Sequence, residues 1–181
     1  LFRSLRAREP RPALRPTAHD GQFDVPTLDE IIALAADAAA RTGRDIALVP
    51  ELKHPSYFRA IGLPMEDRFV VELKRLGLTG ADAPILIQCF EVGPLERLSK
   101  RIDAPLAQLV AAKGGPADRA DVTYAQMVTP EGLRAIAAYA NWVAPEMTLA
   151  LPRDADSFST ALSIMCVTVL VLSYAGIVLM P

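Results

Sequence analysis

The chain has 181 residues and a formal net charge of −2, from 19 basic and 21 acidic side chains. This length is enough for one domain with a buried core, and the balanced charge argues against a partner that is a nucleic acid. The two cysteines, Cys89 and Cys166, have neither the spacing of metal ligands nor the number expected of a disulfide framework.

The first third of the sequence predicts one helix followed by one strand. Residues 1–26 are rich in arginine and proline and predict irregular structure. Thr27 and Glu30 have the spacing of a capping box, and the apolar periodicity after them predicts a helix that Gly43 ends. Residues 46–50 are apolar and predict a short buried strand.

The rest of the sequence continues this alternation of helices and strands. It predicts helices over 65–76, 94–101 and 129–140, and strands over 84–90, over 105–110 and from 141 onward. These strands are continuously apolar, which is typical of a parallel sheet covered by helices. No glycine-rich loop follows a strand, so dinucleotide-binding and P-loop folds are disfavoured. The pattern predicts an α/β protein, either an open doubly wound sheet or a partial TIM barrel with about four of the eight β/α units.

The C-terminal part of the sequence has a different composition. From residue 155 onward the only charged residue is Asp156, and residues 161–180 are uncharged and mostly apolar. Such a segment is long enough to be a membrane-spanning helix. Buried strands and a non-native end of the reading frame are the alternatives. We therefore expect a domain over 1–154 and a separate apolar tail over 155–181.

Opposite charges follow the first predicted strand. Glu51 and Lys53 are two residues apart, so on an extended chain their side chains point the same way. Active sites of parallel α/β proteins lie at this end of the strands. A mutual surface ion pair is the alternative interpretation. A Schiff-base role for Lys53 requires a neutral amine, which the neighbouring carboxylate disfavours.

Six phrases of the sequence, all in the same order, resemble the glycerophosphodiester phosphodiesterase family, in particular its bacterial periplasmic type. They lie at residues 5–9, 20–28, 49–55, 87–91, 105–109 and 139–145. The phrase at 49–55 resembles the PELK-x-P element of that family. The resemblance covers residues 1–153 and implies a TIM barrel. It also implies hydrolysis of a small-molecule glycerophosphodiester to sn-glycerol 3-phosphate and an alcohol, with Ca²⁺ or Mg²⁺ as the cofactor.

The resemblance also implies roles for individual residues. Glu51 matches a carboxylate that binds the metal, since such cations take oxygen ligands. Lys53 matches an active-site lysine, which we interpret as catalytic and as a contact to the phosphate or another substrate oxygen. Gln88 and Phe90 would line the substrate cleft if they face the barrel axis; otherwise Cys89 does.

Several motifs of the family are not in this sequence. The HRG motif, the E-x-D pair of metal carboxylates and the second catalytic histidine are missing. His19 is not that histidine, because it directly precedes the phrase at 20–28 and its context fits that loop, and His54 occupies a variable position. We therefore expect this chain alone to bind the cation poorly and to be an inactive fragment. The alternative is a non-catalytic barrel remnant tethered to a membrane through residues 161–180. By analogy with relatives, the protein would be exported to the periplasm or outside the cell.

Overall fold

A computed structural model describes residues 4–150 and 177–179 of the chain. The chain divides into two compact units, Leu1–Arg44 and Asp45–Pro181. The expected apolar tail and the candidate membrane segment 161–180 lie outside the described residues, apart from the short strand β5 (Ile177–Leu179). In the described part of the chain, no helix has the length and hydropathy needed to cross a membrane.

The first unit contains the helix α1 (Leu28–Thr42), whose two ends are those that the sequence predicts. The Thr27 side chain accepts a hydrogen bond from the Glu30 amide, and the Glu30 carboxylate accepts one from the Thr27 amide at 2.7 Å. Gly43 ends the helix in the left-handed conformation with φ 65°, and its amide donates to the Ala39 carbonyl. The predicted capping box and the glycine stop are therefore both confirmed.

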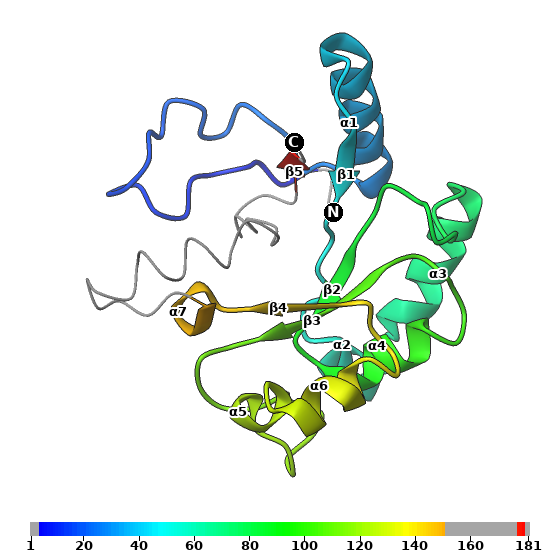
Figure 1. The fold of residues 1–181 in the computed structure, drawn as a ribbon. Coiled ribbons are helices and arrows are strands. Elements are labelled where there is room, and N and C mark those ends of the chain that lie inside the picture. Colours follow the sequence, from blue (N-terminus) through cyan, green and yellow to red (C-terminus); the bar gives the residue numbers. More distant parts are fainter. Residues whose placement is uncertain (1–3, 151–176, 180–181) are drawn as a thin grey trace. The chain divides into compact units, whose positions relative to one another are not determined.

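The sheet of the second unit is parallel and follows chain order. Its strands are β1 (Ile46–Leu48), β2 (Ile87–Cys89), β3 (Leu106–Val110) and β4 (Trp142–Pro145). β2, β3 and β4 pair in that order (Figure 1). The end of β1 and the residues after it lie beside β2, through parallel bridges of Leu48 with Ile85 and of Glu51 with Gln88. This arrangement is consistent with part of a TIM barrel, although the described strands do not close into one.

One edge of this sheet carries a strand of opposite direction. β5 pairs antiparallel with β1, with Ile46 opposite Leu179 and Leu48 opposite Ile177. Antiparallel addition at an edge is common in otherwise parallel sheets. The outer edge of β1 is therefore paired.

Helices follow each of the strands β1 to β4 along the chain. They are α2 (Pro55–Ala60), α3 (Met65–Arg75), α4 (Val92–Leu98), α5 (Tyr124–Met127), α6 (Pro130–Ile136) and α7 (Met147–Ala150). The three helices that the sequence predicts here correspond to α3, α4 and α6, with shifted ends. α2, α5 and α7 were not predicted, because segments of six, four and four residues are too short to show a helical period.

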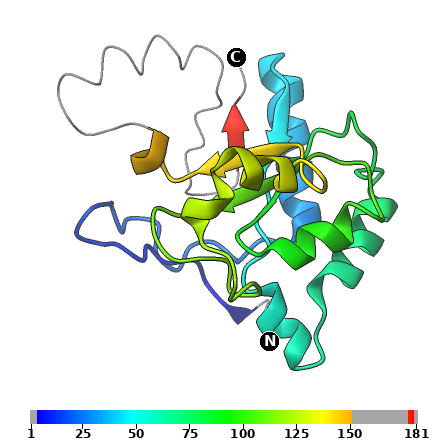
Figure 2. The same ribbon diagram turned by 60° about the horizontal axis from the view of Figure 1, so that its bottom comes forward.

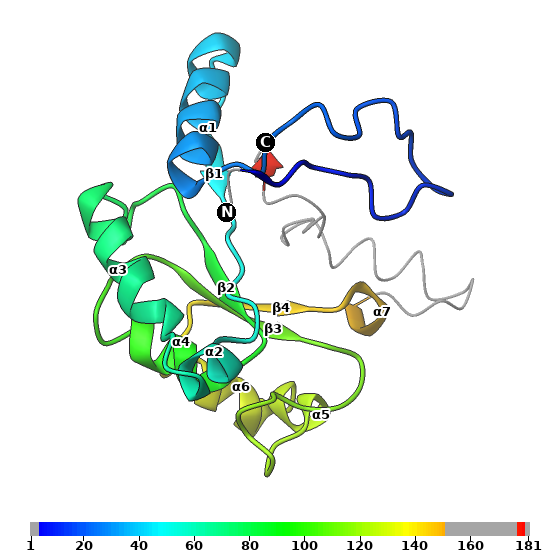
Figure 3. The ribbon, with the colours of Figure 1, turned by 180° about the vertical axis from the view of Figure 1, so that it is seen from behind.

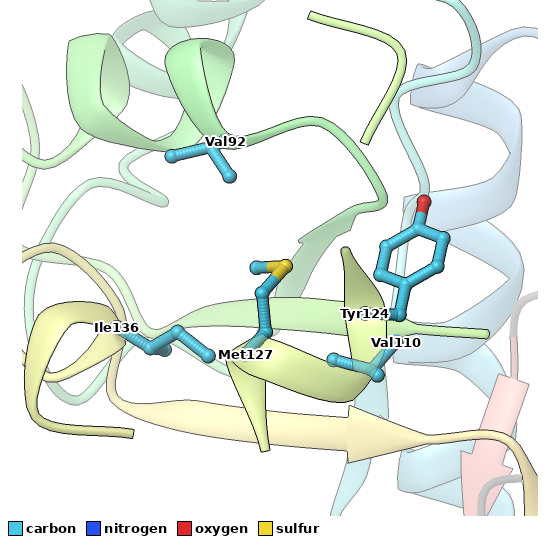
Figure 4. Packing of buried hydrophobic residues seen from close by; sticks show 5 residues of the cluster. All are labelled: Val92, Val110, Tyr124, Met127 and Ile136. Atoms are coloured by element: carbon cyan, nitrogen blue, oxygen red, sulfur yellow. The ribbon is translucent and has the colours of Figure 1, made fainter. Parts of the chain in front are cut away.

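The helices α4, α5 and α6 pack on one face of the sheet (Figure 2). Val92 of α4, Met127 of α5 and Ile136 of α6 form a buried cluster with Val110 of β3 and with Tyr124 (Figure 4). Apolar burial of this kind is the main source of stability in such a layer. It fixes which way every residue of β3 faces, since side chains alternate along a strand.

The face away from these helices carries a row of four paired residues. Glu51 lies opposite Gln88, Gln88 opposite Ala107, and Ala107 opposite Trp142. Val110 faces the helices, and Ala107 is three residues before it, so the row points to the other face. This is the face that would line the interior of a closed barrel.

A buried carboxylate links three helices on the outside of the sheet. Glu66, at the start of α3, is completely buried. Its Oε1 accepts a hydrogen bond from Nε of Arg97 in α4 at 2.9 Å, and its Oε2 accepts one from Arg59 in α2 at 3.2 Å. Figure 3 shows these helices side by side. Burial alone would raise the pKa of Glu66, but the two arginines hold it below its ordinary value.

We expect Glu66→Gln to lower the free energy of unfolding by about 2 kcal/mol, because it leaves two arginines without their counter-charge. The pKa of Glu66 is lower in the folded state than its ordinary value of 4.5. The extra unfolding free energy of the wild type over the variant is therefore fully present above pH 4.5. It is lost as the pH falls through the lowered pKa of the folded state. Urea denaturation at pH 7 and at pH 3 measures both effects.

The matched control is Glu131→Gln, which removes an exposed ion pair with Arg134. It should change the stability by less than about 0.5 kcal/mol. Equal unfolding midpoints for the two variants at pH 7 would contradict the role assigned to Glu66.

Candidate functional site

A cavity of about 320 Å³ lies at the carboxyl ends of the first three parallel segments. The end of β1 contributes Glu51, Leu52, Lys53 and His54; the end of β2 contributes Cys89, Phe90 and Glu91; the chain after β3 contributes Gly115, Ala117 and Tyr124. The structure thus brings Glu51, Lys53 and Phe90 together at one cavity, and their roles there stay predictions. This is the end of a parallel sheet at which binding sites form.

Glu51 and Lys53 form an ion pair at the cavity. The Lys53 ammonium lies 2.8 Å from Oε2 of Glu51. The Glu51 side chain is 22% exposed and the Lys53 side chain 69%. The ion pair between Glu51 and Lys53, which was the alternative interpretation of these two residues, is therefore present. The Glu51 carboxylate nevertheless lines the cavity and is mostly shielded from water. Because Lys53 is largely exposed, its ammonium is free to exchange Glu51 for another anion.

The strand register decides which residues of 84–90 face which way. Gln88 lies beside Glu51 on the face away from the helices, and Phe90, two residues on, lines the cavity. Gln88 itself is buried and is not part of the cavity lining. Cys89 also reaches the cavity, so the two alternatives for this strand are not exclusive. A role for Gln88 in binding substrate stays a prediction.

The Cys89 thiol is a structural group rather than a nucleophile. Burial raises its pKa to about 12, and the nearby carboxylates of Glu91, Asp118 and Glu51 add to this rise. The thiol is therefore protonated at neutral pH, and its Sγ donates to the Leu52 carbonyl at 3.3 Å. Only a thiolate would attack an electrophile.

Gln108 holds the end of β2 in place. This buried side chain of β3 donates through Nε2 to the Phe90 carbonyl at 3.1 Å and to the Leu109 carbonyl at 3.0 Å. Its Oε1 accepts a hydrogen bond from the Tyr139 hydroxyl at 2.8 Å. The backbone of Phe90 is thereby fixed at the rim of the cavity. Sequence reasoning missed this residue, although a lone amide inside an apolar strand was a visible signal.

Glu91 is the second carboxylate of the cavity, and sequence reasoning did not single it out. It is only 4% exposed, and its Oε2 accepts a hydrogen bond from the Ser56 amide at 2.9 Å. Like Glu51, it is an acidic residue directly after a buried strand. That shared position was the signal that could have found it.

The loop after β3 closes one side of the cavity. Asp118 accepts hydrogen bonds from the Val92 amide at 3.1 Å and the Gly93 amide at 2.6 Å, which ties the loop to the start of α4. These bonds satisfy amide groups that a helix start leaves free. They explain why α4 begins two residues before the predicted helix 94–101. A Cβ on Gly115 would meet the Val122 carbonyl oxygen at 2.2 Å, so the loop requires glycine there.

His54 turns the chain from β1 into α2. Its φ of 51° and ψ of 44° are left-handed, and Pro55 follows at the first position of the helix. A residue other than glycine in this conformation is strained by roughly 1 kcal/mol or more. This turn places the Ser56 amide where it donates a hydrogen bond to the Glu91 carboxylate. His54 also lines the cavity.

The described residues do not form a complete site for Ca²⁺ or Mg²⁺. Among residues 4–150 and 177–179, no three His, Cys, Asp or Glu side chains gather as metal ligands would. Ca²⁺ takes six to eight oxygen ligands, and Mg²⁺ takes an octahedral set. Glu51 offers a suitable oxygen, but Lys53 already neutralises it. The fit to a divalent cation is therefore partial.

Comparison with known proteins supports the resemblance read from the sequence. No protein-family model matches the chain. The chain is 28% identical over 171 residues to the curated protein "Glycerophosphodiester phosphodiesterase GDPD6" of Arabidopsis thaliana. The match covers 88% of this chain and 45% of that protein, so the chain spans less than half of the relative's length. A plant relative gives no support for the bacterial periplasmic type in particular.

We expect Gly115→Ala to destabilise the protein by more than about 2 kcal/mol, because the new Cβ collides with the Val122 carbonyl. The control is Gly80→Ala, where no atom lies within 4 Å of the added carbon and the change should stay within about 0.5 kcal/mol. Urea denaturation of both variants measures the difference. If Gly115→Ala leaves the free energy of unfolding unchanged, the loop after β3 does not pack against the Val122 carbonyl as described.

Proposed function

We propose that this chain is part of a glycerophosphodiester phosphodiesterase and that its cavity contributes Glu51 and Lys53 to the site that cleaves the diester. The observation that carries the proposal is the placement of both residues in one cavity at the ends of parallel strands. The name of the Arabidopsis relative supports the same chemistry. The bacterial periplasmic type stays a hypothesis that rests on the six sequence phrases.

Lys53 is the residue we assign to the phosphoryl group. Hydrolysis of a phosphodiester develops negative charge on the phosphoryl oxygens, and a positioned ammonium stabilises it. Lys53 has the exposure needed to leave Glu51 and meet an incoming phosphate. The products would be sn-glycerol 3-phosphate and an alcohol. In the free protein, Glu51 keeps the ammonium in place at the cavity.

We assign Glu51 one ligand position of a divalent cation, Ca²⁺ or Mg²⁺, in the complete enzyme. Such a cation, when bound, would neutralise charge on the phosphoryl oxygens. The sequence does not contain the other carboxylates and the two catalytic histidines that the resemblance implies. Within this chain, Glu51 orients Lys53, and Phe90 shapes the wall beside it.

This chain alone should not hydrolyse glycerophosphocholine at a significant rate, because Glu51 and Lys53 supply neither a complete metal site nor an acid–base pair. The purified chain is assayed for released sn-glycerol 3-phosphate with and without Ca²⁺ or Mg²⁺. A rate within about tenfold of ordinary enzyme turnover, on the order of 10 per second, would show that the missing motifs are dispensable.

Lys53→Met should weaken the binding of sn-glycerol 3-phosphate about tenfold, since a charge-assisted hydrogen bond is lost. The matched control is Lys74→Met on α3, an exposed lysine outside the cavity lining, which should bind as the wild type does. ³¹P NMR titration at fixed ionic strength measures the affinities. If both variants bind alike, Lys53 does not contact the phosphate.

A further inference from the structure

We infer that Glu91 is a positioning residue, which holds the turn between β1 and α2 and so places Lys53 at the cavity. Glu91 follows β2, and the turn that it holds consists of Lys53 and His54. The effect of Glu91 on the backbone follows from the structure alone. Its consequence for a ligand rests on the proposed function, in which Lys53 meets the phosphoryl group.

The Glu91 side chain does not cap its own helix. Glu91 is the N-cap residue of α4, a position from which a carboxylate ordinarily accepts hydrogen bonds from the first amides of the helix. Its side chain forms no such bond with α4. The Asp118 carboxylate accepts hydrogen bonds from the Val92 and Gly93 amides instead. The Glu91 carboxylate is therefore available for a contact outside α4.

The start of α2 receives this carboxylate. His54 is the N-cap residue of α2, and its side chain forms no capping hydrogen bond. Pro55 follows and has no amide hydrogen, so Ser56 carries the first amide that the helix leaves without an internal partner. That amide donates to Oε2 of Glu91 at 2.9 Å, across 35 residues of chain. Glu91 thus caps α2 from the end of a neighbouring strand.

The same hydrogen bond offsets a strained turn. His54 has φ 51° and ψ 44°, a left-handed conformation that residues other than glycine adopt only at a cost in free energy. Such a conformation persists where the surrounding contacts impose it. Glu91 is only 4% exposed, and a hydrogen bond to a buried carboxylate is one of the stronger kinds in proteins. Without this bond, we expect the turn to relax and Lys53 to lose its fixed place.

Lys53 lies between two anchors that belong to the same short segment of chain. On the strand side, the Leu52 amide donates to the Gln88 carbonyl at 3.0 Å. On the helix side, the Ser56 amide donates to Glu91. Gln88 is in β2 and Glu91 is three residues further on, so one segment holds the turn from both sides. The backbone of Lys53 is therefore fixed, although its side chain is 69% exposed.

A second attachment keeps α2 in place when the first is removed. Arg59, near the end of α2, donates to the buried Glu66 at 3.2 Å, and Glu66 also accepts a hydrogen bond from Arg97 of α4. α2 is therefore attached at both of its ends. Loss of the Glu91 contact should loosen the turn at the start of α2 without detaching the helix. We accordingly expect variants of Glu91 to fold.

The first measurement is hydrogen exchange of the Ser56 amide, followed by NMR in the whole chain without ligand. Glu91→Ala removes the acceptor, so the amide should exchange at least about tenfold faster than in the wild type. Glu91→Gln keeps a side-chain oxygen at the same place and should restore most of the protection. Equal exchange rates in the wild type and in Glu91→Ala would overturn the inference, because the turn would then be held without Glu91.

The second measurement is the affinity for sn-glycerol 3-phosphate, by ³¹P NMR titration at fixed ionic strength. Glu91→Ala should weaken binding about fivefold, the effect of one hydrogen bond of ordinary strength. Glu91→Gln keeps that hydrogen bond and should bind within about twofold of the wild type. If Glu91→Gln loses as much affinity as Glu91→Ala, the charge of Glu91 matters rather than its hydrogen bond, and the inference fails.

The matched control is Glu146→Ala. Glu146 directly follows β4, and its Oε2 accepts a hydrogen bond from the Ala112 amide at 2.9 Å, which is a contact of the same kind and length. Glu146 is outside the cavity lining. This variant should leave the Ser56 exchange rate and the affinity within about twofold of the wild type. An equal loss of affinity in Glu146→Ala would overturn the inference, since any loosened strand end would then have the effect.

A double-mutant cycle separates the positioning of Lys53 from a general structural role. In a Lys53→Met background, Glu91→Ala should weaken binding by no more than about twofold further, because residues that act through one contact are not additive. Additive losses would overturn the inference, because Glu91 would then act on the ligand by another route. If Lys53→Met binds as the wild type does, the proposed role of Lys53 and its consequence for the ligand both fail, and the Ser56 exchange rate alone decides whether Glu91 holds the turn.

Discussion

The parallel pairing between the end of β1 and β2 is the constraint on which the cavity depends. The Gln88 amide donates to the Pro50 carbonyl at 2.9 Å, and the Leu52 amide donates to the Gln88 carbonyl at 3.0 Å. This pairing sets Glu51 beside Gln88, and so places the charged turn after β1 next to the acidic end of β2. A shift of one residue would turn Glu51 toward the helices.

Packing and function share residues at this end of the sheet. Tyr124 is part of the apolar cluster under α4 and α6, and its ring is also a wall of the cavity. Gln108 is buried in β3 and holds the Phe90 carbonyl. The shape of the cavity is therefore set by the core, and Lys53 is an exposed charged group at its wall. Walls that the core holds in place are suited to ordering a ligand without a large entropic penalty.

The two carboxylates of the cavity, Glu51 and Glu91, have different partners. Glu51 forms an ion pair with Lys53, while the Glu91 carboxylate accepts a hydrogen bond from the Ser56 amide. Burial, with a smaller contribution from the nearby carboxylates, raises the pKa of the Cys89 thiol and so removes a competing nucleophile from the site.

Local signals in the sequence determined the helix ends at Thr27, Gly43 and Thr129, the apolar strands, and the pair Glu51 and Lys53, because caps, periodicity and alternation act over a few residues. The tertiary structure alone decided the roles of Glu91, Gln108 and Gly115. Glu91 meets the Ser56 amide across 35 residues of chain, and Asp118 starts α4 from 25 residues away. Such contacts depend on which strands pair and in what register, and a single sequence carries no local mark of that choice.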